Sequence, residues 1–116
     1  MSHALAPLAV TMGDPAGCGP HITMAAWTAR GSHPLHPFFV IADPRLFGDK
    51  VPLRMIDTPS EALDCFSDAL PVLPQQMDAF DKLVTGTPSG EYASAIIDSI
   101  EIATKLTLNG DASGVV

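Results

Sequence analysis

The ten residues from Met12 to His21, MGDPAGCGPH, constrain the fold of this chain more than any other stretch. Three glycines and two prolines follow directly after an apolar run. Because glycine and proline interrupt regular structure, a buried strand over Leu8–Met12 must end at Gly13. From Pro20 the apolar residues take helical spacing, and this helix closes at Gly31. The pattern therefore predicts a strand, a tight loop and a helix in succession.

A second strand follows, and it extends the pattern to strand, helix, strand. Phe38–Ala42 is a continuous apolar run of strand-forming residues, which is typical of a strand covered on both faces. Val51–Ile56 is expected to be a third strand, in which Pro52 is tolerated only near the start or on a sheet edge. The order of these elements predicts an α/β fold.

The middle of the chain is expected to be less regular. A short helix is predicted over Glu61–Leu70, and Pro71 and Pro74 exclude any long regular element after it. The polar, interrupted stretch Gln75–Gly90 is interpreted as a loop.

The clearest helical pattern spans Ser89–Asn109, and Gly110 supplies its stop. A buried strand is then expected to open at Ala112–Val116, which suggests the N-terminal piece of a longer α/β chain, although a strand can also end a protein. Residues 1–116 are therefore taken as one α/β portion. The face predicted to be buried on the helix consists of Tyr92, Ile96, Ile100, Ala103 and Leu106.

Charge and cysteine content narrow the class of partner. Thirteen acidic and six basic side chains give a net charge of -7, which disfavours nucleic acid and anionic membranes as partners. No apolar run approaches the roughly 18 residues of a membrane span. Cys18 and Cys65 fit no metal or redox spacing and are interpreted as reduced thiols. A cytoplasmic protein with a small-molecule or protein partner is expected.

Two known phosphate-binding motifs can be compared with the glycine stretch. A P-loop needs Gly-Lys-Ser/Thr, but here Gly19 is followed by proline and histidine, so that motif fails. The dinucleotide fingerprint finds its first two glycines in Gly17 and Gly19, but Ile22 occupies the third position, where a small residue is needed. Asp43 follows at about the distance of a ribose-binding acid. A strand followed by Asp-Pro is also a common turn, and both interpretations of Asp43 remain open.

Two general roles for the glycine stretch also stay open. Its backbone N–H groups can attract an anion at a helix N-terminus, or the glycines can build only a sharp corner with Pro20 in the first helical turn. Asp14 is suited to capping the helix or the turn as well as to binding a ligand. His33 and His36 lie in a proline-broken stretch without acidic or thiol partners, so a solvated loop is favoured over a metal site.

Three segments together resemble the 4-hydroxythreonine-4-phosphate dehydrogenase family of pyridoxine biosynthesis. They are PLAVTMGDPAGCGPHIT at residues 7–23, FFVIADPRLFG at residues 38–48, and GTPSGEYASAIIDSIEIATKLTLNGDASGVV at residues 86–116. The resemblance covers the whole chain and is weakest at residues 75–84. It identifies these residues as similar to the N-terminal part of that family.

The resemblance implies a larger α/β enzyme with a three-layer sandwich like that of isocitrate and isopropylmalate dehydrogenases. It implies a cytoplasmic homodimer that oxidises and decarboxylates 4-phosphohydroxy-L-threonine with NAD or NADP and a divalent metal such as Zn, Mg or Co. Related enzymes take another hydroxy-acid phosphate or a dihydrodiol. A stand-alone nucleotide- or anion-binding module is the alternative from another class.

The resemblance also assigns site residues. Gly13, Asp14, Gly17 and Gly19 match a family motif beside the cofactor cleft, whereas the family's catalytic and metal-binding residues fall outside these segments. The chain alone is therefore expected to be inactive. Two positions depart from the family pattern: Cys18 stands where Ile or Val is usual, and His21 where an acid is usual.

Overall fold

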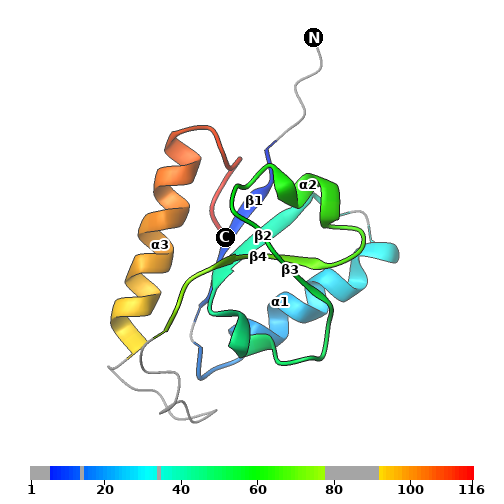
Figure 1. The fold of residues 1–116 in the computed structure, drawn as a ribbon, viewed down its shortest axis with the longest axis horizontal. Helices are drawn as coiled ribbons and strands as arrows, with labels where there is room; N and C mark the ends of the chain where they lie inside the picture. The colour runs from blue at the N-terminus through cyan, green and yellow to red at the C-terminus, as the bar shows by residue number, and fades with distance from the viewer. Residues whose placement is uncertain (1–5, 14, 34, 78–91) are drawn as a thin grey trace.

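Four parallel strands form one sheet, as the order of the predicted elements requires. The computed structural model describes residues 6–13, 15–33, 35–77 and 92–116 (Figure 1). The sheet order is β1-β2-β4-β3, and every pair of neighbouring strands is parallel. The α/β fold class is confirmed. The elements are β1 (Leu8–Thr11), α1 (Gly19–Thr28), η1 (Ala29–Gly31), β2 (Phe38–Ala42), η2 (Pro44–Phe47), β3 (Leu53–Met55), α2 (Glu61–Cys65), β4 (Leu70–Pro74) and α3 (Ala93–Leu108).

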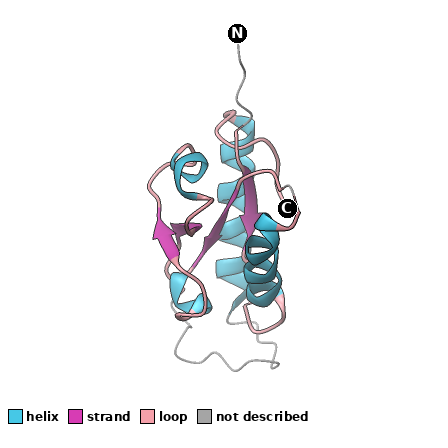
Figure 2. Cartoon of the chain, turned by 90° about the vertical axis from the view of Figure 1, so that its right-hand side faces the viewer, coloured by secondary structure: helices cyan, strands magenta, loops and turns pink. Residues whose placement is uncertain are grey.

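The continuous apolar run of β2 is explained by burial on both faces of the sheet. All five residues of β2 are buried, between β1 and β4. Phe38 and Val40 belong to the core that contains Trp27 of α1, whereas Phe39 and Ile41 belong to the core on the α2 and α3 side. Successive side chains of a strand point to opposite faces, so helices must cover both. Figure 2 shows the strands in the middle of the molecule with helices to either side.

Helix α3 confirms the predicted helix but corrects its buried face. Ile100 is 46% exposed, whereas Ser99 is fully buried within the stripe that faces the sheet. A helix turns by about 100° per residue, which places position 99 nearer than position 100 to the line through Tyr92 and Ala103. The apolar pattern missed this because the residue at the centre of the stripe is a serine.

Strand β4 was not predicted, because its two prolines argued against regular structure. Pro71 and Pro74 do limit it to five residues. Backbone N–H groups alternate between the two neighbours of a strand. The backbone of Pro71 faces β2, but the pairing of β4 with β2 begins only at Val72. The backbone of Pro74 faces β3, but the pairing of β4 with β3 already ends at Val72. Neither proline therefore removes a ladder hydrogen bond.

The remaining expectations are confirmed in part. Pro52 immediately precedes β3, which is the edge strand, and α2 is shorter than predicted. Residues 113–116 pair with β1 in parallel, since the Ala9 N–H donates to the Gly114 carbonyl and the Val116 N–H to the Ala9 carbonyl. The predicted burial of Ala112–Val116 is confirmed at Ala112, which is 3% exposed, but not at Val116, which is 67% exposed. Most of the predicted 75–90 loop lies outside the described residues.

Candidate functional site

The carboxyl ends of the strands gather the loops that carry the candidate residues. The stretch after β1, the turn after β2 and the segment after β4 all lie at one edge of the sheet, in the lower part of Figure 1. Helices α1 and α3 both begin at this edge. Open parallel α/β sheets bind their ligands at the carboxyl ends of the strands. We call this region the carboxyl edge.

The glycine corner, residues 13–20, turns the chain from β1 into α1. Gly13 has φ of +63°, a conformation that costs other residues roughly 1 kcal/mol or more. A Cβ atom at Gly13 would lie 3.7 Å from Cα of Gly19, an ordinary contact, so backbone conformation rather than space requires this glycine. Gly19 begins α1, with Pro20 in its first turn. Gly13, Gly17 and Gly19 thus share one corner, while Asp14 lies outside the described residues.

The positive end of the α1 dipole lies at the helix N-terminus, and no described side chain compensates it. No described side chain caps this helix, and its first turn carries no acidic residue. The first backbone bond within the turn runs from the Ile22 N–H to the Cys18 carbonyl. Helix α3 starts at the same edge, and among the residues that the structure describes no side chain caps it and no acid lies in its first turn. Two helix dipoles therefore direct positive potential toward the carboxyl edge, which suits an anionic ligand.

A small apolar cluster packs around Ala16 of the glycine corner. Ala16 of the corner packs with Met77 and Tyr92, and all three side chains are buried. Gln75, directly after β4, donates from its Nε2 to the Ala95 carbonyl at 3.0 Å. The corner is thereby joined to the segment after β4 and to the start of α3.

Asp43 follows β2 at the same edge, but its carboxylate is already occupied. Oδ1 accepts from the backbone N–H and Nε of Arg45, both at 3.0 Å. Oδ2 accepts from Nη2 of Arg45 at 2.6 Å and from the Met77 N–H at 2.9 Å. The side chain is 2% exposed and caps η2. The structure therefore favours the Asp-Pro turn over the ribose-binding role.

The protonation of Asp43 follows from these contacts. Burial raises the pKa of its carboxyl, but hydrogen bonds from the Arg45 side chain and from the backbone of Met77 and Arg45 lower it, and so does the Arg45 charge. The balance leaves the pKa below its ordinary value. Asp43 is therefore charged at neutral pH and serves to fasten the segment after β4 to the end of β2.

Ser99 is a site-supporting residue that the sequence analysis missed. Its Oγ donates to the Ile41 carbonyl at 2.9 Å and accepts from the Met12 N–H at 3.2 Å. This hydroxyl joins α3 to the last residues before the glycine corner. The available signal was a small polar residue in the middle of an otherwise apolar helix stripe.

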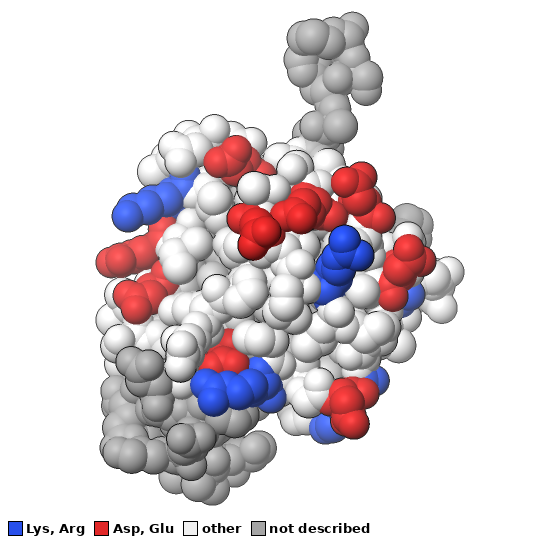
Figure 3. Space-filling model, viewed as in Figure 1, with Lys and Arg blue, Asp and Glu red and all other residues white. Residues whose placement is uncertain are grey.

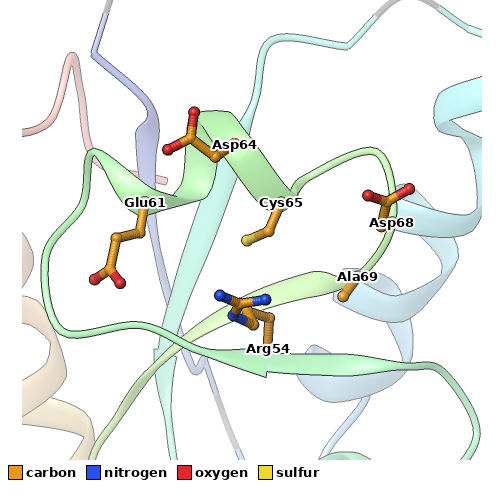
Figure 4. Close-up of a pocket in the computed structure, with 6 residues that line it drawn as sticks. All are labelled: Arg54, Glu61, Asp64, Cys65, Asp68 and Ala69. Carbon is orange, nitrogen blue, oxygen red and sulfur yellow. The ribbon is translucent and has the colours of Figure 1, made fainter.

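A separate pocket of about 300 Å³ lies between α2 and β3 (Figure 4). Its lining includes Arg54, Asp64 and Cys65. Burial raises the pKa of the Cys65 thiol, which disfavours the reactive thiolate. Glu61 accepts hydrogen bonds from the backbone N–H groups of Thr58 and Asp57, which lower its pKa and hold it in its own turn. The pocket therefore lacks the features of a catalytic centre.

The histidines and cysteines form no metal site in the part of the chain that the structure describes. His36 is half-buried, and its Nε2 lies 2.7 Å from the Ala6 carbonyl oxygen. His21 and His33 are exposed. Cys18 and Cys65 are both free, as predicted.

The surface carries both acidic and basic side chains (Figure 3). On the face shown in Figure 3, acidic side chains outnumber basic ones, and the basic side chains form no continuous patch. Among the described residues, no helix has the length and apolar character needed to cross a membrane.

These features define a parallel α/β protein with a candidate anion-binding corner at the carboxyl edge of its sheet. No protein-family model matches the chain. The 4-hydroxythreonine-4-phosphate dehydrogenase of Methylorubrum populi is 41% identical over an alignment of 117 positions, which covers 95% of this chain and 33% of the relative. The enzyme of the same name from Caulobacter vibrioides is 42% identical over 114 residues, again 95% and 33%. The chain spans about a third of the length of these curated relatives.

Solved structures give the same family name. The crystal structure of 4-hydroxythreonine-4-phosphate dehydrogenase from Klebsiella pneumoniae matches with a TM-score of 0.77 and 25% identity over 95% of this chain and 36% of that one. The Burkholderia phymatum structure matches in fold, with a TM-score of 0.82 at 21% identity, over 97% of this chain and 36% of that one. The resemblance seen in the sequence is thus confirmed: the chain is a relative of the 4-hydroxythreonine-4-phosphate dehydrogenases.

Proposed function

We propose that these residues form the glycine-corner portion of an NAD(P)-dependent dehydrogenase that oxidises and decarboxylates 4-phosphohydroxy-L-threonine in pyridoxal phosphate biosynthesis. The carboxyl edge is one wall of its cofactor cleft. Gly13, Asp14, Gly17 and Gly19 shape that wall and bind the cofactor. The proposal includes the isocitrate dehydrogenase-like three-layer sandwich, the homodimer and the cytoplasmic location that the resemblance implies.

The single observation that carries the proposal is the start of α1 beside Gly13, which no described side chain caps. The positive φ of Gly13 turns the chain sharply enough for α1 to begin at the carboxyl edge. Backbone N–H groups in such a corner bind phosphate oxygens without any side chain. Asp43 has no part in ribose binding, since Arg45 and Met77 already donate to both of its oxygens.

The described residues suit the phosphate groups of a nicotinamide cofactor, which when bound would accept the hydride from the substrate alcohol. They do not suit the divalent metal, because no group of three described His, Cys, Asp or Glu side chains could hold one. The proposal therefore assigns this chain no step at a metal. The residues of this chain position the cofactor's phosphates and close one side of the cleft. The chain alone is expected to be inactive.

A chimera tests the proposal directly. The segment of the Methylorubrum populi enzyme that matches this chain is replaced by residues 1–116, and turnover of 4-hydroxythreonine 4-phosphate with NAD and NADP is measured. We expect activity within about tenfold of the parent enzyme, a difference of about 1.4 kcal/mol in barrier. A folded chimera with no turnover would contradict the proposal.

The position of His21 gives this experiment a second variant. His21 is exposed in the first turn of α1, where the family pattern has an acid. If the chimera turns over slowly, His21→Glu should restore the rate, with the exposed His33→Gln as the matched control. Recovery with His33→Gln instead would show that the corner is not responsible.

A substrate panel and a binding titration separate the alternatives. If the chimera preferred another hydroxy-acid phosphate or a dihydrodiol to 4-hydroxythreonine 4-phosphate, this chain would instead be assigned to a related dehydrogenase with that substrate. The chain alone should bind NAD and NADP weakly or not at all, because one wall of a cleft leaves most of the cofactor in water. Tight nucleotide binding by the chain alone would instead favour a stand-alone binding module.

A further inference from the structure

The guanidinium of Arg45 lies at the carboxyl edge, two residues after Asp43. The Arg45 side chain is 46% exposed, whereas the Asp43 carboxylate that it contacts is 2% exposed. Nε and Nη2 of Arg45 donate to that carboxylate, and the shortest contact is 2.6 Å. Nη2 also donates to the Met77 carbonyl oxygen at 3.2 Å. A buried carboxylate and a carbonyl therefore hold in place a cation that still presents almost half of its side-chain surface to solvent.

The backbone beneath this side chain is held as well. Arg45 lies in η2, and its N–H donates to Oδ1 of Asp43 at 3.0 Å. Two residues later, Phe47 is 2% exposed and belongs to the core that contains Met24 and Trp27 of α1. η2 therefore packs on the α1 side of the sheet. A long side chain that is already ordered loses little further freedom when it binds a ligand.

Met77 connects Arg45 to the glycine corner. Its backbone contacts both members of the ion pair, since its N–H donates to Asp43 and its carbonyl accepts from Arg45. Its side chain packs with Ala16, in the middle of the corner. One residue therefore separates the exposed cation from the corner at which α1 begins. Residues 13–20 contain no lysine or arginine, so Arg45 adds a positive charge that the sequence of the corner lacks.

The chemistry of these groups favours a phosphoryl ligand. The N-terminus of α1 directs positive potential toward the carboxyl edge. An arginine fork donates hydrogen bonds to two oxygens of a phosphate at once, which a lysine cannot do. Asp43 offsets only part of the Arg45 charge, because its carboxylate also accepts from the backbone N–H groups of Arg45 and Met77.

We propose that Arg45 is a binding residue that contacts a phosphoryl group of the ligand held at the glycine corner. The inference rests on the proposed function, which supplies the ligands. The substrate of that reaction carries one phosphate, NAD and NADP carry a pyrophosphate, and NADP carries a 2′-phosphate in addition. The contact would make Arg45 a determinant of which phosphorylated ligand binds most tightly.

Equilibrium binding to the chimera described above tests the inference without relying on turnover. Calorimetry gives Kd separately for NAD, NADP and 4-hydroxythreonine 4-phosphate, in Arg45→Gln and in Arg45→Lys. Arg54→Gln is the matched control, because Arg54 is also exposed but lines the pocket beside α2. Asp43→Asn is the second control, because it breaks the same ion pair and keeps the cation.

Arg45→Gln should raise Kd for at least one of the three ligands by about tenfold or more. Arg45→Lys keeps the charge but not the fork, so it should raise the same Kd by about threefold, and it carries the test if Arg45→Gln does not fold. Each control should change Kd by less than about twofold. Weaker binding of NADP alone assigns the contact to the 2′-phosphate, of both cofactors to the pyrophosphate, and of the substrate alone to its phosphate, and each of these results supports the inference.

Unchanged Kd values for all three ligands in Arg45→Gln would overturn the inference, even if the chimera is active. An equal loss in Asp43→Asn would also overturn it, because Arg45 would then act only by holding the turn. An equal loss in Arg54→Gln would overturn it as well, since any surface cation would then serve. An inactive chimera in which ligand binding still depends on Arg45 would contradict the proposed reaction but support the phosphoryl contact.

Discussion

The glycine corner and the Asp43 turn occupy equivalent places, at the carboxyl ends of two neighbouring parallel strands, yet they differ in what they leave available. The corner ends in a helix that no described side chain caps. The turn ends in a carboxylate that already accepts hydrogen bonds at both oxygens. Position at the carboxyl edge therefore does not make a residue a ligand group. A ligand group also needs unused hydrogen-bonding capacity.

Removal of the Asp43 carboxylate should give the largest effect. Asp43→Ala leaves the Met77 N–H buried without its acceptor and removes the carboxylate to which Arg45 donates, so we expect the free energy of unfolding to fall by about 2 to 3 kcal/mol. Urea denaturation measures it. The exposed Asp64→Ala should change stability by less than about 0.5 kcal/mol. An equally small change for Asp43→Ala would mean that its carboxylate is available to a ligand after all.

Loss of the Ser99 hydroxyl should give an intermediate effect. Ser99→Ala leaves the Ile41 carbonyl and the Met12 N–H without this partner, at an expected cost of about 1 to 2 kcal/mol. Hydrogen exchange at the Met12 amide should accelerate with it. Ser94→Ala, in the exposed first turn of the same helix, is the control. If both variants behaved alike, the hydroxyl would not support the corner.

The pH dependence of the Asp43 turn should give the smallest effect. Its pKa is lowered in the folded chain, so its contribution is fully present above the ordinary value of about 4. As the pH falls below that value, the unfolded chain takes up the proton first, and the contribution is lost. The stability difference between the native chain and Asp43→Asn should therefore be constant above about pH 5 and shrink toward pH 3. A stability difference that grew in acid would mean that the pKa of Asp43 is raised, not lowered, in the folded chain.

Local patterns in the sequence predicted much of the fold. The strand before Gly13, the helix after it and the buried strand β2 follow from breakers and apolar spacing, and all three are present. β4 could not be predicted in this way. Its two prolines fit the sheet only because the pairing with β2 begins after Pro71 and the pairing with β3 ends before Pro74. That information lies in the pairing register of distant segments.

The candidate site was predictable only in part, for the same reason. Gly13 signals a turn from sequence alone, and its positive φ agrees with that signal. The occupancy of Asp43 depends on Met77, 34 residues further along, and the role of Ser99 depends on Met12, 87 residues away. Hydrogen bonds across such separations leave no periodic trace, so sequence spacing could not choose between the ribose ligand and the turn.

Cofactor kinetics of the Gly13→Ala chimera test the central claim most directly. Gly110→Ala is the matched control, because Gly110 also has a positive φ, +84°, but follows the far end of α3. Both variants should lose about 1 kcal/mol of stability. Only Gly13→Ala should raise KM for the nicotinamide cofactor, by about tenfold, because it moves backbone donors of the corner. An unchanged KM in Gly13→Ala, or an equal rise in Gly110→Ala, would contradict a cofactor role for the glycine corner.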